Sequence, residues 1–127
     1  REGPRLPALA REAEATQIRL EESIERREEI MQLRTLLAEY GLSFTELARS
    51  TPKHADTRDR MIEIGRAVAS DSQLRAQIKK RKALPIMAVA LLSGLSRKTV
   101  ERHRRYLLAL VLILTNDLPH LQTYLRP

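Results

Sequence analysis

Five basic side chains follow a glycine and a serine between residues 94 and 106. The stretch reads Gly94-Leu95-Ser96-Arg97-Lys98-Thr99-Val100-Glu101-Arg102-His103-Arg104-Arg105-Tyr106. Ser96 is a favourable N-cap residue, so the stretch predicts a turn followed by a helix with one basic face. Arg and Lys side chains can donate to O6 and N7 of guanine, and Glu can accept from N4 of cytosine. This helix therefore has the chemistry needed to read the edges of DNA bases.

A short apolar helix opened by Pro85 precedes this stretch, and the pair predicts a helix-turn-helix over about residues 85–106. Two helices that cross at a wide angle need a small residue near the crossing and a glycine in the turn. Ala90 and Gly94 supply these, and Val100 supplies an apolar contact between the helices. Apolar residues at helical spacing continue to Leu114, so we expect the second helix to run on as a long core helix.

Turning this second helix by 100° per residue separates its polar side chains into two groups. Lys98, Glu101, Arg102 and Arg105 fall opposite the apolar side and are the expected base-reading residues. Arg97 and Arg104 fall at the flanks, where we expect phosphate contacts, which fix the register of a protein on DNA without specifying sequence.

The positive charge of the chain is concentrated on this region. The net charge is +7, but residues 1–78 carry 13 bases against 14 acids, a balance of −1. Residues 79–105 carry nine bases against Glu101 alone, a balance of +8, and the remainder is neutral. The cluster Lys79, Lys80, Arg81 and Lys82 could be a phosphate clamp, or it could simply be cations stabilising the C-terminus of a helix. A solvated basic face on a helical bundle is the alternative for the whole region.

Helical periodicity appears throughout, and no strand alternation appears, so the fold class is all-α: a multi-helix bundle containing the helix-turn-helix. After an irregular start, residues 1–29 form a charged helical linker or arm. Residues 30–127 form the helical DNA-binding domain, with helices expected over 30–40, 44–49, 57–69, 72–82 and beyond. Ser43 and Asp71 are expected N-caps, Gly41 is an expected helix end, and Asp117 is expected to cap a last short helix.

Several classes of function are disfavoured by what the chain contains. There is no cysteine and the three histidines are scattered, so we expect no disulfide, metal site or cofactor. No paired carboxylates, nucleophile–base set or phosphate loop indicates an enzyme. The scarcity of aromatic residues (3%) disfavours RNA, whose bases stack on aromatic rings. The longest apolar run, residues 106–114, is too short to span a bilayer, so we expect no direct membrane insertion. With no signal peptide visible, the expected location is the cytoplasm.

Several separate blocks resemble the C-terminal half of sigma-I type RNA polymerase sigma factors. These blocks are Glu39–Leu47 (EYGLSFTEL), Thr51–Arg58 (TPKHADTR), Leu84-Pro85, Gly94–Arg102 (GLSRKTVER), Ala109–Leu114 and Asp117–Leu121 (DLPHL). They occur in order over roughly residues 25–126. The resemblance implies the C-terminal domain of an alternative sigma factor, which recognises the promoter minus-35 element through its helix-turn-helix. The reading helix of the family falls on Ser96, Arg97, Lys98, Glu101, Arg102 and Arg105, which adds Ser96 to the base-reading set.

The same resemblance implies three partners: double-stranded promoter DNA, the RNA polymerase core, and a membrane-anchored, RsgI-like anti-sigma factor that holds the sigma factor inactive. It does not assign anti-sigma contacts to residues of this chain.

Two other interpretations remain open from the sequence. A free-standing helix-turn-helix regulator would normally dimerise to read two half-sites. A helical protein-interaction module could use the same basic helix to bind an acidic partner.

Overall fold

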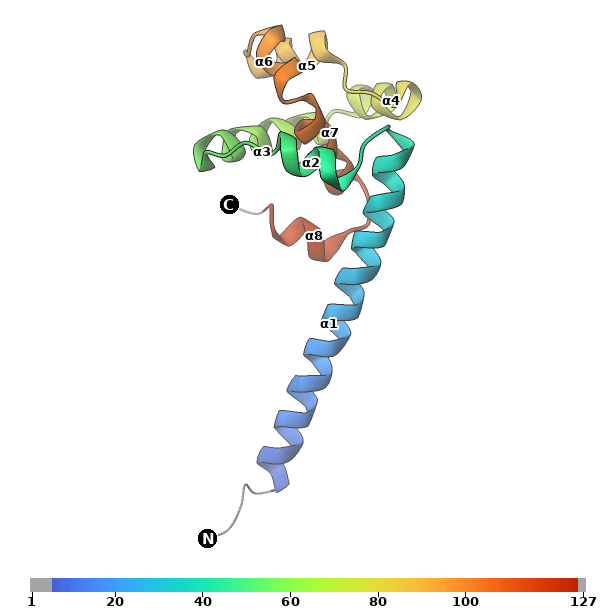
Figure 1. Ribbon diagram of the computed structural model, residues 1–127, viewed down its shortest axis with the longest axis vertical. Coiled ribbons are helices and arrows are strands. Elements are labelled where there is room, and N and C mark those ends of the chain that lie inside the picture. The colour runs from blue at the N-terminus through green and yellow to red at the C-terminus, as the bar shows by residue number, and fades with distance from the viewer. Residues whose placement is uncertain (1–5, 126–127) are drawn as a thin grey trace.

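The fold consists of helices gathered into a bundle from which one long helix projects. The computed structural model describes residues 6–125 (Figure 1). In order the helices are α1 (Leu6–Glu39), α2 (Phe44–Ser50), α3 (Ala55–Ser70), α4 (Ser72–Arg81), α5 (Ile86–Ser93), α6 (Arg97–Arg102), α7 (Arg104–Thr115) and α8 (Pro119–Thr123). No strand occurs in the described range, and the predicted all-α class is confirmed.

Helix α7 forms the centre of the bundle. Its residues Tyr106–Leu112 are all buried, as their uninterrupted apolar character predicted. Helix α3 crosses it closely because Gly65 leaves room: a Cβ atom there would lie 3.2 Å from Cβ of Leu110. The buried residues Met61, Ile64 and Val68 line the same side of α3. Helices α1, α2 and α8 also pack against α7, so α7 holds the other elements in place.

The capping signals predicted from the sequence for the starts of α2 and α4 and for the end of α1 are confirmed. The hydroxyl of Ser43 accepts from the backbone N–H of Glu46 at 3.2 Å, and the carboxylate of Asp71 accepts from Gln73 and Leu74. Gly41 adopts a left-handed conformation with φ of 72° after α1, and its neighbour Leu42 donates back to the carbonyl of Leu37. These ends are fixed by residues within a few positions of one another, which is why the sequence showed them.

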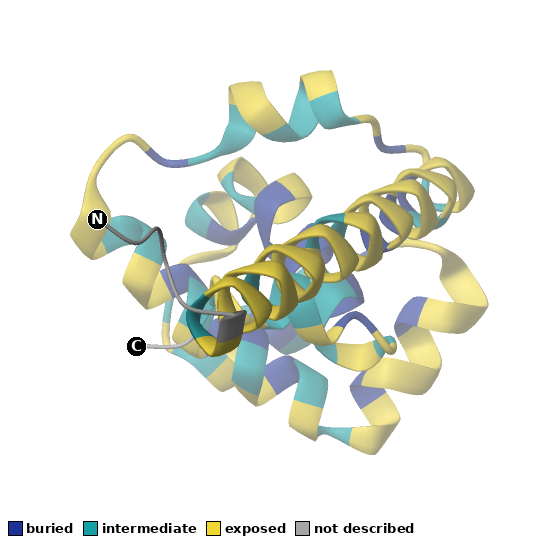
Figure 2. Ribbon diagram, turned by 90° about the horizontal axis from the view of Figure 1, so that it is seen from below, coloured by how far each residue is buried: buried dark blue, intermediate teal, exposed yellow. Residues whose placement is uncertain are grey.

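Helix α1 runs without a break from Leu6 to Glu39, so the boundary expected between residues 29 and 30 lies inside a continuous helix. Residues 1–5 of the expected irregular start lie outside the described residues, whereas residues 6–10 are helical. Pro7 fits in the first turn because no intrahelical N–H bond is required there. Figure 2 looks along this helix and shows its outer part exposed on nearly every side. We call residues 6–24 of α1 the arm.

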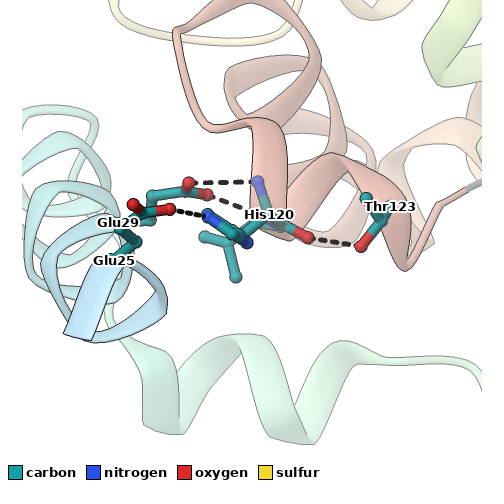
Figure 3. A network of polar contacts seen from close by, with 5 residues as sticks. Glu25, Glu29, His120 and Thr123 are labelled. Carbon is teal, nitrogen blue, oxygen red and sulfur yellow. Dashed lines mark hydrogen bonds and ion pairs between the residues drawn. The ribbon is translucent and has the colours of Figure 1, made fainter. Parts of the chain in front are cut away.

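Helix α8 is capped by a residue of α1 and not by Asp117. Its N-cap position is Leu118, which makes no side-chain cap. The carboxylate of Glu29 instead accepts from the backbone N–H groups of His120 at 3.0 Å and Leu121 at 2.9 Å (Figure 3). Glu25 adds a 2.5 Å contact between its carboxylate and Nε2 of His120. We call these contacts the latch, because they tie α8 to the base of the arm.

Candidate DNA-binding surface

Helices α5 and α6 meet through the short turn that the sequence predicted. Gly94 ends α5 in a left-handed conformation with φ of 74°, and its N–H donates to the carbonyl of Ala90 at 3.0 Å. The hydroxyl of Ser93 accepts from the N–H of Leu95, and the hydroxyl of Ser96 caps α6 by accepting from Thr99 at 3.1 Å. The turn is thus fixed by hydrogen bonds at both ends.

The apolar contacts beneath the turn fix the direction of α6. Val89 of α5 and Val100 of α6 are fully buried, and Ala90 and Leu95 are partly buried against the same core. Because Val100 faces inward, the residues on the other side of this six-residue helix face solvent. Ser96, Lys98, Glu101 and Arg102 are all exposed.

The structure divides the expected long helix at His103, so α6 and the core helix α7 are separate elements. His103 has φ of −103° and ψ of 12°, and its N–H is shared between the carbonyls of Thr99 and Val100 at 3.2 Å each. This departure from helical geometry lets α6 lie against α5 while α7 enters the core. Burial and the neighbouring Arg102 cation lower the pKa of the half-buried His103 imidazole, which favours its neutral form in the folded chain.

Two of the predicted contact residues on α6 already pair with each other. Nε of Arg97 lies 3.7 Å from a carboxylate oxygen of Glu101, and Arg97 also points back over α5 to the sulfur of Met87 at 3.6 Å. Lys98 and Arg102 take part in no ion pair found within residues 6–125. These two exposed cations are therefore available to an incoming anion.

Arg104 and Arg105 start α7 and lie on the far side of the break from Arg102. Both line a groove of about 440 Å³ together with Lys82, which brings the start of α7 close to the end of α4. Nε of Arg105 lies 3.5 Å from a carboxylate oxygen of Glu46 on α2. Sequence spacing had placed Arg105 with Lys98 and Arg102 on one helix face. In the structure Arg105 belongs to α7, not to α6, and it pairs with Glu46 of α2.

The basic cluster at the end of α4 is exposed along its whole length, from Lys79 to Lys82. Lys82 adopts a left-handed conformation with φ of 55°, and its ammonium lies 4.8 Å from the centre of the Tyr40 ring. This cation–π contact orients one member of the cluster. Burial and then the Glu39 carboxylate raise the pKa of the Tyr40 hydroxyl, which favours its neutral form.

Sequence reasoning missed the contribution of α2. Glu46, Arg49 and Ser50 line one groove with Arg102 and Arg105, so α2 flanks the basic side chains of α6 and α7. No local sequence pattern indicates this position of α2, because its sequence predicts only a short capped helix with Phe44 and Leu47 directed inward. We use the term basic surface for the predicted contact residues Arg97, Lys98, Arg102, Arg104, Arg105 and Lys79–Lys82, with α2 at its flank.

Two further searches concern the described part of the chain only. No group of three or more His, Asp or Glu side chains in residues 6–125 could hold a metal ion. Within the same range, none of the helices combines the length and the apolar character that crossing a membrane requires.

Comparison with known proteins identifies relatives over most of the chain. No family model matches. The chain is 39% identical over 105 residues to RNA polymerase sigma factor SigI of Bacillus subtilis (strain 168), covering 83% of this chain and 42% of that protein. It is 36% identical over 101 residues to SigI of Bacillus anthracis, covering 80% and 42%. A third relative, SigI6 of Acetivibrio thermocellus, is 36% identical over 103 residues, covering 81% and 41%.

The chain spans about two fifths of the length of the curated relatives it matches. The similarity extends over about four fifths of the chain itself, as the resemblance of its separate sequence blocks predicted. These similarities support the assignment of the chain as a C-terminal domain of the sigma-I type of RNA polymerase sigma factors.

Proposed function

We propose that this domain recognises the minus-35 element of promoter DNA and thereby helps an alternative RNA polymerase sigma factor to direct transcription initiation. The observation that carries the proposal is the exposed α6, capped by Ser96 and backed by Val100, with Lys98 and Arg102 facing solvent. Its relatives are named RNA polymerase sigma factors, which supports the same assignment.

The position of α6 in the molecule suits entry into a groove of DNA. Figure 1 shows α5 and α6 at the end of the bundle opposite the outer end of the arm, so a duplex could approach α6 without meeting the arm. The major groove of B-DNA is wide enough to admit a helix, and the first residues of such a helix commonly contact base edges. In this proposal Ser96, Lys98, Glu101 and Arg102 read bases. Phosphates are contacted by Arg97, Arg104, Lys79–Lys82 and also Arg105, which begins α7 and does not continue α6.

The ion pairs seen in the free domain do not all have to survive binding. An exposed pair such as Arg97–Glu101 contributes little to stability, so it can break when DNA binds. Arg97 would then contact a phosphate and Glu101 a base. Lys98 and Arg102 need no such exchange. We therefore expect Arg102 to be the most informative residue to change.

Fluorescence anisotropy with a cognate promoter duplex and a random duplex tests the base-reading assignment. Arg102→Ala should weaken binding to the cognate duplex by about 1–3 kcal/mol and should affect the random duplex much less. Arg19→Ala, a change of the same charge on the arm, is the matched control and should leave both affinities nearly unchanged. Equal weakening of both duplexes by Arg102→Ala would mean that Arg102 contacts phosphate and not a base.

The remaining partners belong to the same proposal. We infer that the full factor works in the cytoplasm, binds the RNA polymerase core, and is restrained by a membrane-anchored, RsgI-like anti-sigma factor. Run-off transcription tests the first partner: core polymerase with a full-length factor carrying this domain should initiate at a cognate promoter, and the Arg102→Ala factor should not. Co-purification of the domain with the cytoplasmic segment of the anti-sigma factor tests the second, and a failure to co-purify would remove that partner.

A further inference from the structure

We propose that Glu46 is a built-in competitor of DNA phosphate at a site formed by Arg49 and Arg105, and that it lowers the affinity of the domain for DNA of any sequence. The site lies between α2 and the start of α7, beside α6. The proposal rests on the proposed DNA-binding function and adds to it a phosphate site and a residue that restrains it.

The side chains concerned come from three helices that only the fold brings together. Glu46, Arg49 and Ser50 of α2 line a groove of about 380 Å³ with Arg102 of α6 and Arg105 of α7. Nε of Arg105 and Oε2 of Glu46 are 3.5 Å apart, and both side chains are a little over two fifths exposed. The groove is thus open to solvent and able to admit a larger anion.

The chemistry of the groove matches a phosphate group. The guanidinium groups of Arg49, Arg102 and Arg105 line the groove with a single carboxylate, so its lining carries an excess of positive charge. Arg is the residue that binds phosphate most specifically, because its planar donors pair with two oxygens at once. A carboxylate oxygen can take the place of a phosphate oxygen, and Oε2 of Glu46 lies 3.5 Å from Nε of Arg105. Glu46 therefore occupies the position that a DNA phosphate oxygen would take beside Arg105.

Glu46 is held in this position by its own helix. Its N–H donates to the hydroxyl of Ser43, and that hydroxyl donates in turn to Oε1 of Glu46 at 3.3 Å. One carboxylate oxygen is therefore used for the cap, and the other faces Arg105. Since the capping interaction fixes the carboxylate, a phosphate approaching Arg105 must displace it or bind beside its negative charge.

This arrangement separates the strength of DNA binding from its specificity. A negative charge beside a phosphate site repels every duplex equally, because the phosphate backbone does not depend on sequence. Weak binding by the isolated domain suits a module that acts while tethered to a larger assembly, where effective concentration compensates.

Glu46→Gln tests the proposal while keeping the helix cap, because Gln is also accepted at the third position of a capping box. The variant should bind cognate and random duplexes more tightly by the same factor. One added phosphate contact steepens the salt dependence of log affinity by about 0.9, so the gain should shrink about 3.5-fold between about 50 and 200 mM salt. Arg49→Gln, which leaves the cap alone, should weaken both duplexes and make the salt dependence shallower by about the same amount.

The matched control is Glu14→Gln, which makes the same change of net charge on the exposed outer arm. If Glu46→Gln has the affinity and salt dependence of Glu14→Gln, Glu46 does not compete with phosphate. Tighter binding by Glu46→Gln to the cognate duplex alone would also overturn the proposal, since it would place Glu46 among base contacts. An unchanged salt dependence in Arg49→Gln would remove the phosphate site itself.

These outcomes are distinct from a failure of minus-35 recognition. If Arg102→Ala weakens both duplexes equally while Glu46→Gln tightens both, the base-reading assignment falls and the phosphate site stands. If Arg102→Ala weakens binding to the cognate duplex alone and Glu46→Gln has no effect, the base-reading assignment stands and the phosphate site falls.

Discussion

Replacement of Glu29 by Ala should release α8 from the base of the arm. Glu29 is only 6% exposed, and its two carboxylate oxygens accept from the N–H groups of His120 and Leu121, one each. Alanine removes both acceptors and leaves the first turn of α8 without a cap. The sequence separation is 91 and 92 residues, so the contact joins two parts of the chain that nothing local holds together.

The expected cost follows from the kind of hydrogen bond that is lost. A hydrogen bond to a charged group contributes about 1.5–3 kcal/mol, and loss of an ordinary N-cap costs about 0.5–2 kcal/mol. Water can reach part of α8 once Glu29 is gone, so we expect Glu29→Ala to lower the free energy of unfolding by about 2–3 kcal/mol. Glu29→Gln keeps one acceptor oxygen but loses the charge that favours a helix N-terminus, and about 1 kcal/mol is expected.

Urea denaturation followed by circular dichroism measures these changes, with Glu28→Ala as the control. Glu28 is the preceding, exposed residue of the same helix, so its replacement has the same effect on helix propensity and should stay within about 0.5 kcal/mol of the wild type. Hydrogen exchange should also become faster at the His120 and Leu121 amides in Glu29→Ala alone. If Glu29→Ala and Glu28→Ala unfold at the same urea concentration, Glu29 does not cap α8 in solution.

Three further predictions concern the core and the helix break. Leu107→Ala should cost about 2–5 kcal/mol in urea denaturation because Leu107 is fully buried at the centre of the bundle. Gly65→Ala should destabilise by roughly 1 kcal/mol, because overpacking against Leu110 outweighs the gain in helix propensity; a higher melting temperature would refute the close approach of α3 to α7. Because burial and then Arg102 lower the pKa of His103 below 6.5, its contribution to stability is complete above that pH and is lost as the pH falls towards the folded-state pKa. His103→Gln should therefore show a weaker loss of melting temperature on acidification than the wild type.

The sequence could predict the features that depend on residues only a few positions apart. Ser43, Asp71 and Ser96 cap their helices by bonding to N–H groups two or three positions away, and a glycine after an apolar helix commonly marks its end. The burial of Val100 and Leu107 followed from their spacing. The class of fold and the position of the basic surface depend on these same local signals.

The features that sequence reasoning missed depend on distant partners. Glu29 looked like one more charge on a solvated arm, because the N–H groups of α8 that donate to it lie some ninety residues further along the sequence. Arg105 appeared to share a face with Arg102, since a straight helix was assumed and nothing at His103 signals a break. The groove between Glu46 and Arg105 requires α2 to lie on α7, and no pattern in either helix specifies that contact.

The latch has a mechanical consequence for the arm. An α-helix rises about 1.5 Å per residue, so the arm extends roughly 28 Å beyond Glu25. A tilt of about 10° at the latch would move its outer end sideways by about 5 Å, which is more than the spacing of about 3.4 Å between successive base pairs along DNA. The latch, together with the packing of α1 on α7, therefore sets the angle of the arm. That angle determines where anything bound near the outer end of the arm would lie relative to α6.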